Sequence, residues 1–268
     1  MRVLCLEGEG AAVRYLSGTL RRMGVDHRSI RPGEPLPRAR GDLQAVVISD
    51  FPRLLLQELE PLIVQAFTLC GLGLLMAGGP LSFGRGGYAG TAIEALLPAE
   101  LAPGDDRVIA VAGALVEAAT PRHPLLRGLS LDEPLAIVGH NRLTARAPAS
   151  VLLASRAIER AGTSGVRLSR KPWPLLLVRE SIDGAMGRSA ALATGLVPPW
   201  SGGLTEWGRA LLSIDGQVEV GADYAAFVLN LVRWLCGEKV LFREGDAFWT
   251  ELPEALLEGR QPVIRAGR

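Results

Sequence analysis

The sequence predicts an α/β fold built on a doubly wound parallel sheet. Two apolar runs, 45–48 and 72–77, contain no charged residue and have the pattern of parallel strands that are buried on both faces. Segments of helical periodicity alternate with strand-like runs over the first third of the chain, as expected where helices connect parallel strands. The chain has 268 residues, of which 48% are apolar and 21% charged. This is the composition of a globular protein that can bury a substantial core.

The elements of the first third follow from periodicity and from the glycines and prolines between them. The expected order is strand 2–7, helix 11–23, strand 25–30, loop 31–42, strand 45–50, helix 53–69 and strand 72–77. Gly78-Gly79-Pro80 ends the last of these strands sharply. Ligands of such sheets bind at the carboxyl ends of the strands, here residues 7–10, 49–51 and 77–83.

The second half of the chain is less regular. Strands are expected at 135–139, 151–154, 175–178 and 189–194, and an exposed loop or hairpin at 156–172. A helix is expected over 222–236, because Phe227, Leu231 and Trp234 recur at helical spacing and Gly237 can cap its end. Trp200, Trp207, Trp234 and Trp249 are explained by core and interface packing without a cofactor.

Charge and cysteine content constrain the partners and the compartment. Lys and Arg total 29 against 28 Asp and Glu, so the balance gives no reason to expect nucleic-acid or membrane binding. Cys5, Cys70 and Cys236 lie in apolar contexts typical of buried free thiols, and their spacing fits no zinc or redox motif. We therefore expect a cytoplasmic protein without a signal peptide, metal or cofactor. The apolar run 62–81 is interpreted as a buried helix and strand, because Gly71 and Gly73 interrupt it and no basic residues flank it.

One block of sequence carries a family resemblance. Gly73-Leu-Leu-Met-Ala-Gly-Gly-Pro-Leu-Ser-Phe83, followed by Tyr88-Ala-Gly-Thr-Ala-Ile-Glu-Ala-Leu-Leu-Pro98, is similar to the signature of the putative glutamine amidotransferase family. Shorter matches follow in order at 105–107, 123–129, 139–142, 151–154 and 232–235. That family resembles the class I glutamine amidotransferases and the ThuA-like proteins. The resemblance covers residues 1–237, implies a flavodoxin-like fold of the class I amidotransferase type, and leaves 238–268 as a C-terminal extension.

The same resemblance exposes departures from glutaminase chemistry. Glutaminases of this fold use a cysteine on a tight elbow after a strand, with a histidine as base and a glutamate that orients it. Gly78 and Gly79 stand at the elbow, and Cys70 precedes the strand. None of the three histidines lies in a His-x-Glu arrangement or follows residue 140. In 194–200 the family's Trp is kept, but Gly195 and Pro199 replace the Asp and His of the family pattern.

These departures favour a catalytically degenerate domain that acts in ligand binding or protein assembly. The alternative is an enzyme of unknown reaction, hydrolase or transferase in type, that uses the same pocket with Asp50, Ser82, Asp106 or His140. A sugar-related role, by analogy with ThuA-like proteins, rests on fold alone.

Each candidate residue also has a structural interpretation. The loop 84–87 with Ser82 either binds an anion through Arg85 or simply connects to a helix near Thr91. Asp105 and Asp106 form either a carboxylate pair or a surface turn with a salt bridge to Arg107. His140 and Asn141 end a strand, where a histidine either faces the pocket or is a hydrogen-bonded core residue.

Two further positions have mainly structural interpretations. His123 is expected in a turn, and Gly8 and Gly10 form a tight turn more readily than a phosphate cradle. No residue is assigned a catalytic role. The pocket candidates are Asp50, Gly78, Gly79, Ser82, Arg85, Asp106, His140 and Asn141.

The C-terminal extension points to a partner. Residues 238–268 carry Phe242, Phe248 and Trp249 among several leucines, more apolar surface than a solvated tail needs. Burial of this surface on the same domain and burial against a second copy or a partner protein both satisfy the pattern. We expect a homo-oligomer or a protein partner, together with a small-molecule ligand.

Overall fold

The computed structural model describes residues 1–8, 15–35, 43–56, 58–162, 164–181, 186–198, 200–214, 216 and 218–237. Its larger strands are β1 (Arg2–Glu7), β2 (Asp26–Ile30), β3 (Ala45–Ser49), β4 (Gly73–Ala77), β6 (Arg107–Ala118), β7 (Ala136–Asn141), β9 (Ser150–Ala161), β10 (Gly165–Leu168), β11 (Trp173–Arg179) and β12 (Ser189–Leu192). Short strands are β5 (Ala99–Leu101), β8 (Leu143–Ala145), β13 (Leu211–Ile214) and β14 (Val218–Gly221). The helices are α1 (Tyr15–Arg22), α2 (Leu59–Cys70), α3 (Ala92–Leu96) and α4 (Ala222–Leu235), with 3-10 turns at Arg53–Leu55, Pro124–Leu126 and Gly202–Glu206.

The central sheet has a parallel half and an antiparallel half. Its strand order is β2-β1-β3-β4-β12-β11-β9-β6-β7, with β10 added to β9. The strands from β2 to β12 run parallel, and β11, β9, β6 and β7 continue as antiparallel neighbours. The prediction that the first four strands are parallel, with β4 near the centre, is confirmed. The fold is the expected doubly wound, flavodoxin-like α/β type.

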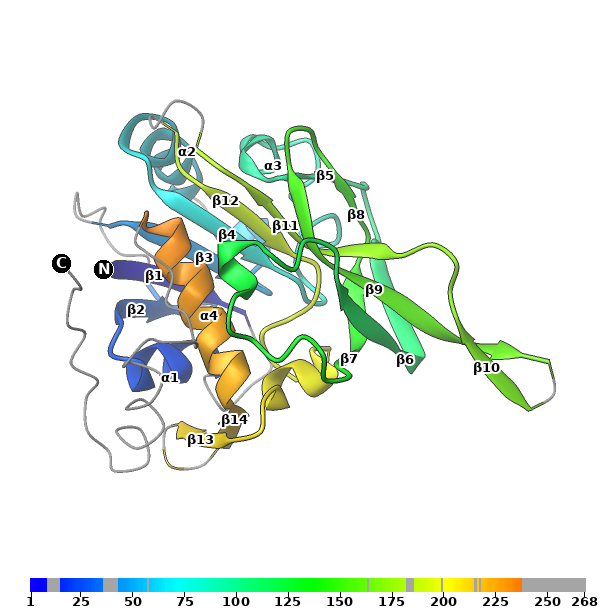
Figure 1. Cartoon of the computed structure of the whole chain (residues 1–268). Coiled ribbons are helices and arrows are strands. Elements are labelled where there is room, and N and C mark those ends of the chain that lie inside the picture. The colour runs from blue at the N-terminus through cyan, green and yellow to red at the C-terminus, as the bar shows by residue number, and fades with distance from the viewer. Residues whose placement is uncertain are drawn as a thin grey trace.

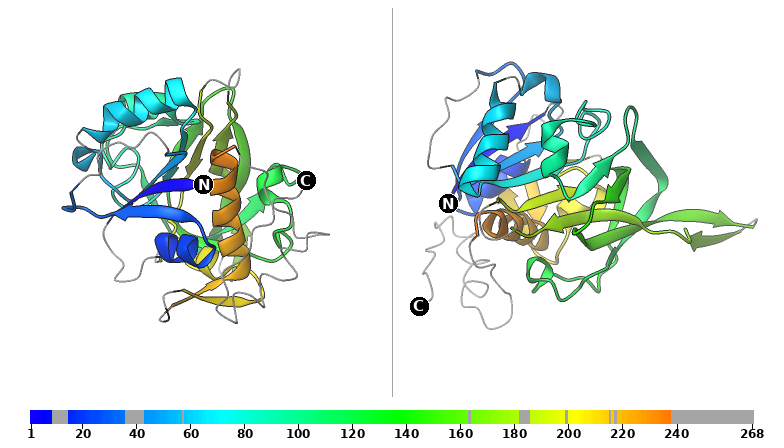
Figure 2. Two further views of the ribbon diagram at one scale, coloured as in Figure 1. Left: turned by 90° about the vertical axis from the view of Figure 1, so that its left-hand side faces the viewer. Right: turned by 90° about the horizontal axis from the view of Figure 1, so that it is seen from above.

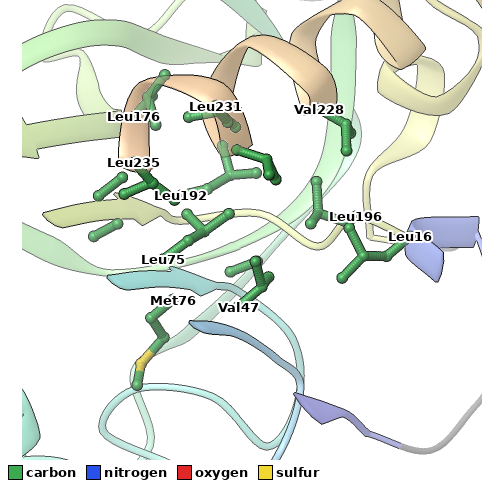
Figure 3. Packing of buried hydrophobic residues seen from close by; sticks show 14 of the residues in the cluster. Leu16, Val47, Leu75, Met76, Leu176, Leu192, Leu196, Val228, Leu231 and Leu235 are labelled. Atoms are coloured by element: carbon green, nitrogen blue, oxygen red, sulfur yellow. The ribbon is translucent and has the colours of Figure 1, made fainter. Parts of the chain in front are cut away.

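Helices cover both faces of the parallel half. Figure 2 shows α1 and α4 on one face and α2 with α3 on the other. The long helix α4 packs Leu231 and Leu235 toward Leu75 and Leu192 of the two central parallel strands, and Val228 toward Leu196 (Figure 3). Both β3 and β4 are buried along their whole length, as their unbroken apolar runs predict.

Several predictions of the second half hold, with shifted boundaries. The strands expected at 135–139, 151–154, 175–178 and 189–194 correspond to β7, β9, β11 and β12. The expected hairpin in 156–172 is formed by the end of β9 and by β10, and it projects from the body of the molecule (Figure 1). The expected helix 222–236 is α4.

Other predictions are corrected. The helix expected at 53–69 is a 3-10 turn followed by α2, which begins only at Leu59. The strand β6 was not predicted. Buried and exposed residues do not alternate regularly along β6, and the pairing of β6 with β7 is interrupted between Ile109 and Ala114. Part of the expected helix 11–23 and the whole extension 238–268 lie outside the described residues.

The cysteines differ from the expectation of three buried thiols. Cys5 is buried in β1, Cys236 is half-buried, and Cys70 is exposed. Cys70 is the last residue of α2 and is exposed there, although its sequence context is apolar. Among the helices that the described residues form, none has the length and apolarity that a bilayer crossing requires.

Candidate functional site

The candidate site is the loop that follows β4 at the carboxyl edge of the parallel strands. The backbone N–H of Gly78 lies 2.8 Å from the carbonyl oxygen of Leu192 and 2.9 Å from that of Thr194, so the chain leaves β4 against the end of β12. A Cβ atom on Gly78 would lie 2.2 Å from the carbonyl oxygen of Ala193. On Gly79, which has a φ of 156°, it would lie 2.4 Å from Oδ1 of Asp50. Neither elbow position therefore has room for a side chain.

Asn141 holds this loop from the end of β7. Its Oδ1 accepts a hydrogen bond from the N–H of Gly79 at 3.1 Å, and its Nδ2 donates to Oδ1 of Asp106 at 3.1 Å. Asn141 is fully buried, so each of these bonds replaces a contact with water. The position of Asn141 as the last residue of β7 directs its amide toward Gly79 in the neighbouring loop.

Asp106 fixes the second half of the same loop. Its carboxylate accepts the backbone N–H of Gly84 at 3.2 Å and that of Arg85 at 3.1 Å. Together with Asn141, this gives a fully buried carboxylate three N–H donors. The three hydrogen bonds compensate for the burial of this carboxylate and link it to the loop.

The expected Asp105–Asp106 pair is therefore divided between two roles. Asp105 is exposed and forms an ion pair with Arg107 at 2.7 Å. The hydrogen bonds from Arg107 hold the pKa of Asp105 well below its usual range. Asp105 is thus the surface salt bridge of the structural interpretation, and only Asp106 belongs to the site.

Ser82 closes the loop back onto β4. Its buried hydroxyl donates to the carbonyl oxygen of Ala77 at 2.6 Å and accepts the backbone N–H of Asp50 at 3.2 Å. A hydroxyl committed in this way is a structural link and not a free nucleophile. Tyr88 adds a second link to the loop after β3, because its buried hydroxyl donates to the carbonyl oxygen of Phe51 at 2.6 Å.

Asp50 is the one candidate whose carboxyl group is only partly used. Its Oδ1 accepts the N–H of Leu81 at 2.6 Å, and among the described residues its other oxygen has no hydrogen-bond partner. Burial raises the pKa of Asp50 to about 6, although the hydrogen bond from Leu81 opposes this rise. The backbone of Asp50 is left-handed, with φ at 49°, a conformation that concentrates at functional sites in non-glycine residues.

The position of Asp50 in the sheet is also that of a ligand site. Asp50 follows β3, and Gly8, which follows β1, donates its N–H to the carbonyl oxygen of Ser49 at 2.8 Å. Because β2 lies on one side of β1 and β3 on the other, the chain reverses its direction of winding between β1 and β3. Ligands of doubly wound sheets bind at this reversal.

Glu7 is a second acidic residue at this reversal. It was not among the predicted site residues. It ends β1, and its carboxylate accepts hydrogen bonds from the hydroxyl of Ser29 and, at 3.4 Å, from the N–H of Ser17 at the start of α1. The signal in the sequence was its place as the last residue of a predicted strand. Gly10, the other half of the predicted turn, lies outside the described residues.

His140 and Arg85 are the two candidates that the structure does not bring into the site. His140 is buried, with its Nδ1 donating to the carbonyl oxygen of Asn141 at 3.1 Å and its ring 6.0 Å from that of Trp173. Because successive side chains of a strand alternate, Asn141 points toward Gly79 and His140 points to the other face. Burial lowers the pKa of His140, which keeps the ring neutral. His140 is therefore a core histidine, and Arg85 contributes its backbone N–H while its side chain is exposed.

The other histidines and the tryptophans agree with their structural interpretations. His123 caps the 3-10 turn that begins at Pro124, where its Nδ1 accepts the N–H of Leu125 at 3.3 Å. Trp200, Trp207 and Trp234 are buried, and Trp249 lies outside the described residues. No group of three or more His, Cys, Asp or Glu side chains within the described part of the chain is arranged to hold a metal ion.

Solved structures share this architecture. The Cytoplasmic Protein STM3548 from Salmonella typhimurium superposes with a TM-score of 0.65 and 22% sequence identity over 88% of this chain and 99% of that one. The Cytoplasmic Protein STM1381 from Salmonella typhimurium LT2 gives 0.64 and 21%, with the same coverage of both chains. The mmIFT52 N-terminal domain gives 0.51 and 12% over 89% of this chain and 100% of that domain. At these identities the likeness is one of fold.

Comparisons of the sequence with curated proteins and with family models give two results. No curated protein matches the chain. A family model described as "Putative glutamine amidotransferase" matches residues 57–209, which include β4, the loop after it, Asp106 and Asn141. The match spans more than half of the chain and contains the block at 73–98 that carries the resemblance. The chain therefore belongs to this glutamine amidotransferase-like family.

Proposed function

We propose that this protein is a catalytically degenerate member of its family that acts in ligand binding and protein assembly, and that it does not hydrolyse glutamine. The observation that carries the proposal is the packing at the elbow. A Cβ at Gly78 or Gly79 would overlap Ala193 or Asp50, so a cysteine at either position requires a different loop. The buried polar side chains around the elbow, Asn141 and Asp106, bond to the loop itself.

The ligand-binding half of the proposal centres on Asp50. Its second carboxyl oxygen is the acceptor that the described site leaves unused, at the reversal between β1 and β3. A carboxyl group with a pKa of about 6 accepts from ammonium or hydroxyl donors when ionised and donates a proton when neutral. We therefore propose a small polar ligand that presents an amine or a hydroxyl group to Asp50.

The proposal of protein assembly is supported by the antiparallel arm, which is the part of the sheet formed by β6, β9 and β10. Val111 of β6 is 96% exposed and Val166 of β10 is 76% exposed. Within the described strands β10 pairs with β9 alone, so its other edge carries unpaired backbone groups. We propose that a second copy of the chain pairs with this edge across a twofold axis, which satisfies both copies at once.

A cytoplasmic location is part of the same proposal. The two Salmonella structures that share the fold are described as cytoplasmic proteins. The exposed Cys70 is a free thiol, which suits a reducing compartment.

Two assays test this function. The purified full chain should release no ammonia from glutamine above the background of a heat-denatured sample. Ammonia release that disappears on Cys70→Ala would overturn the degenerate interpretation. A thermal-shift screen of amines, amino acids and polyols should yield compounds that stabilise the wild type and not Asp50→Asn. Asp105→Asn is the matched control, because that carboxylate is exposed and already paired with Arg107.

One observation favours a second function. A carboxyl group with a pKa of about 6 suits a general acid or base near neutral pH, so Asp50 is the residue on which an enzyme of this fold would depend. Turnover of a screened compound by the wild type, with a pH profile that changes in Asp50→Asn, would establish this alternative over simple binding.

A further inference from the structure

Helix α2 carries an apolar surface on the side that faces away from the sheet. Leu59, Ile63 and Phe67 are buried beneath it. On the opposite side Leu62 is 40% exposed and Leu69 is 71% exposed. A surface helix normally presents polar residues to water, but the only charged residue of α2 is Glu60. The outer face of α2 therefore has the composition of a covered surface.

The same face borders a groove. The groove lies between the start of the 3-10 turn, α2 and the start of α3, and its lining residues are Arg53, Glu60, Pro61, Val64, Gln65, Thr68, Leu69 and Ala92. Arg53 and Glu60 bond to each other at 2.8 Å at one end. The other end, near Thr68 and Leu69, is next to the carboxyl terminus of α2.

We propose that the C-terminal segment 238–268 of the same chain docks along this outer face of α2 and fills the groove. The argument rests on where the described chain ends, on the length of the segment beyond it, and on the composition of that segment. It is independent of the ligand proposed for Asp50.

The described chain ends at the same edge of the sheet as α2. Phe67, in the last turn of α2, accepts the N–H of Gly187 at 2.9 Å. The next residue, Arg188, donates from Nη1 to the carbonyl oxygen of Trp234 in the last turn of α4 at 2.8 Å. Leu235 also lies directly against Gly73, at the start of β4. The last turns of α2 and α4 therefore share one edge of the sheet, and the described chain ends at that edge.

The segment is long enough and apolar enough. Thirty-one residues follow Gly237. They can span about 100 Å when extended, whereas the twelve residues of α2 are about 18 Å long. Phe242, Phe248 and Trp249 supply large apolar side chains that cost free energy when they remain in water.

The C-terminal segment is favoured over a second copy as the occupant of the groove, because it is covalently attached to the same chain. A segment attached next to its docking surface has an effective concentration on the order of millimolar, which exceeds that of a second protein molecule in ordinary solution. Docking in this way removes two apolar surfaces from water within one molecule.

The reactivity of the Cys70 thiol measures whether the segment is docked on α2. It is exposed at the end of α2, next to Leu69, while Cys5 is fully buried. In the full chain carrying Cys236→Ala, the rate at which DTNB reacts therefore reports access to Cys70. Substituting Phe248→Gln and Trp249→Gln together should raise that rate roughly tenfold, which corresponds to a segment docked about nine-tenths of the time.

Substitutions on the helix complete the test. Leu62→Gln with Leu69→Gln should raise the rate to the same level, and combining both pairs should give no further increase, because either pair already releases the segment. Leu211→Gln, at an exposed leucine of β13, is the control and should leave the rate unchanged.

Three outcomes would overturn the proposal. The first is a rate that the tail substitutions do not change, and the second is helix and tail effects that multiply instead of saturating. The third is a dimer in sedimentation whose dissociation alone exposes Cys70, since a second copy would then cover α2.

Discussion

The side-chain oxygen of Asn141 accepts the backbone N–H of Gly79 across 62 residues of sequence, at 3.1 Å, and thereby joins the antiparallel half of the sheet to the loop at the centre of the parallel half. The amide of Asn141 also reaches Asp106, so one side chain connects both ends of the candidate site. Substitution of Asn141 should therefore lower the stability of the fold before it changes the function.

Asn141→Ala should lower the free energy of unfolding by about 2–3 kcal/mol, because it leaves the N–H of Gly79 buried without a partner and removes one donor from Asp106. Urea unfolding measures this. Asp105→Asn removes an exposed ion pair and should change the free energy of unfolding far less. Equal effects of the two substitutions would contradict a bracing role for Asn141.

Gly79→Ala should be more damaging than an alanine at an open glycine. The added Cβ would lie 2.4 Å from Oδ1 of Asp50, so the loop or Asp50 must move. We expect a loss of more than about 2 kcal/mol. Gly90→Ala is the control, because Gly90 also has a positive φ but nothing lies within 4 Å of its Cβ position, so only about 1 kcal/mol of backbone strain is expected there. Similar midpoints for the two variants would show that the loop adapts to a side chain.

The stability contributed by Asp50 should depend on pH with a definite sign. Burial raises the pKa of Asp50 from 3.8 to about 6, so between these values the folded protein binds more protons than the unfolded chain. This contribution is present at low pH and is lost as pH rises through 6. Asp50→Asn should therefore gain stability relative to the wild type, by about 2 kcal/mol, between pH 4.5 and pH 7.5. An unfolding free energy difference that stays constant across this range would refute the raised pKa.

Self-association should depend on the antiparallel arm. If a second copy pairs with the free edge of β10, Val166→Asp places a charge in the contact. Sedimentation velocity at micromolar concentration should then show a dimer for the wild type and a monomer for Val166→Asp. Leu211→Asp, on β13, serves as the control and should remain dimeric. A wild type that is monomeric at every concentration tested would exclude this contact.

The parts of the fold that could be predicted from sequence are those set by local composition. The runs ending at Ser49 and Ala77 predicted buried parallel strands, and their carboxyl ends placed Asp50, Gly78, Gly79 and Ser82 at one edge. Helix α4 was predicted by its apolar spacing alone. In each case the pattern within a few residues determines both the element and its burial.

The parts that could not be predicted depend on pairing over long distances. Asp106 and Asn141 belong to the site only because β6 and β7 pair with Arg107 opposite Asn141. Whether His140 or Asn141 faces the loop depends on a single step of register, which sequence composition does not reveal. The exposure of Cys70 was not predicted, because its apolar sequence context was interpreted as that of a buried thiol.

The place of β12 in the sheet has a consequence for how the protein is made. Residues 189–192 supply the parallel neighbour of β4, whereas β3, the other neighbour, is complete by residue 49. During synthesis, the inner edge of β4 therefore stays open until more than a hundred further residues have left the ribosome. Contacts between such distant segments form slowly, and an unpaired hydrophobic strand edge favours aggregation while it waits. The sheet of the nascent chain therefore cannot close at its centre until β12 has been made.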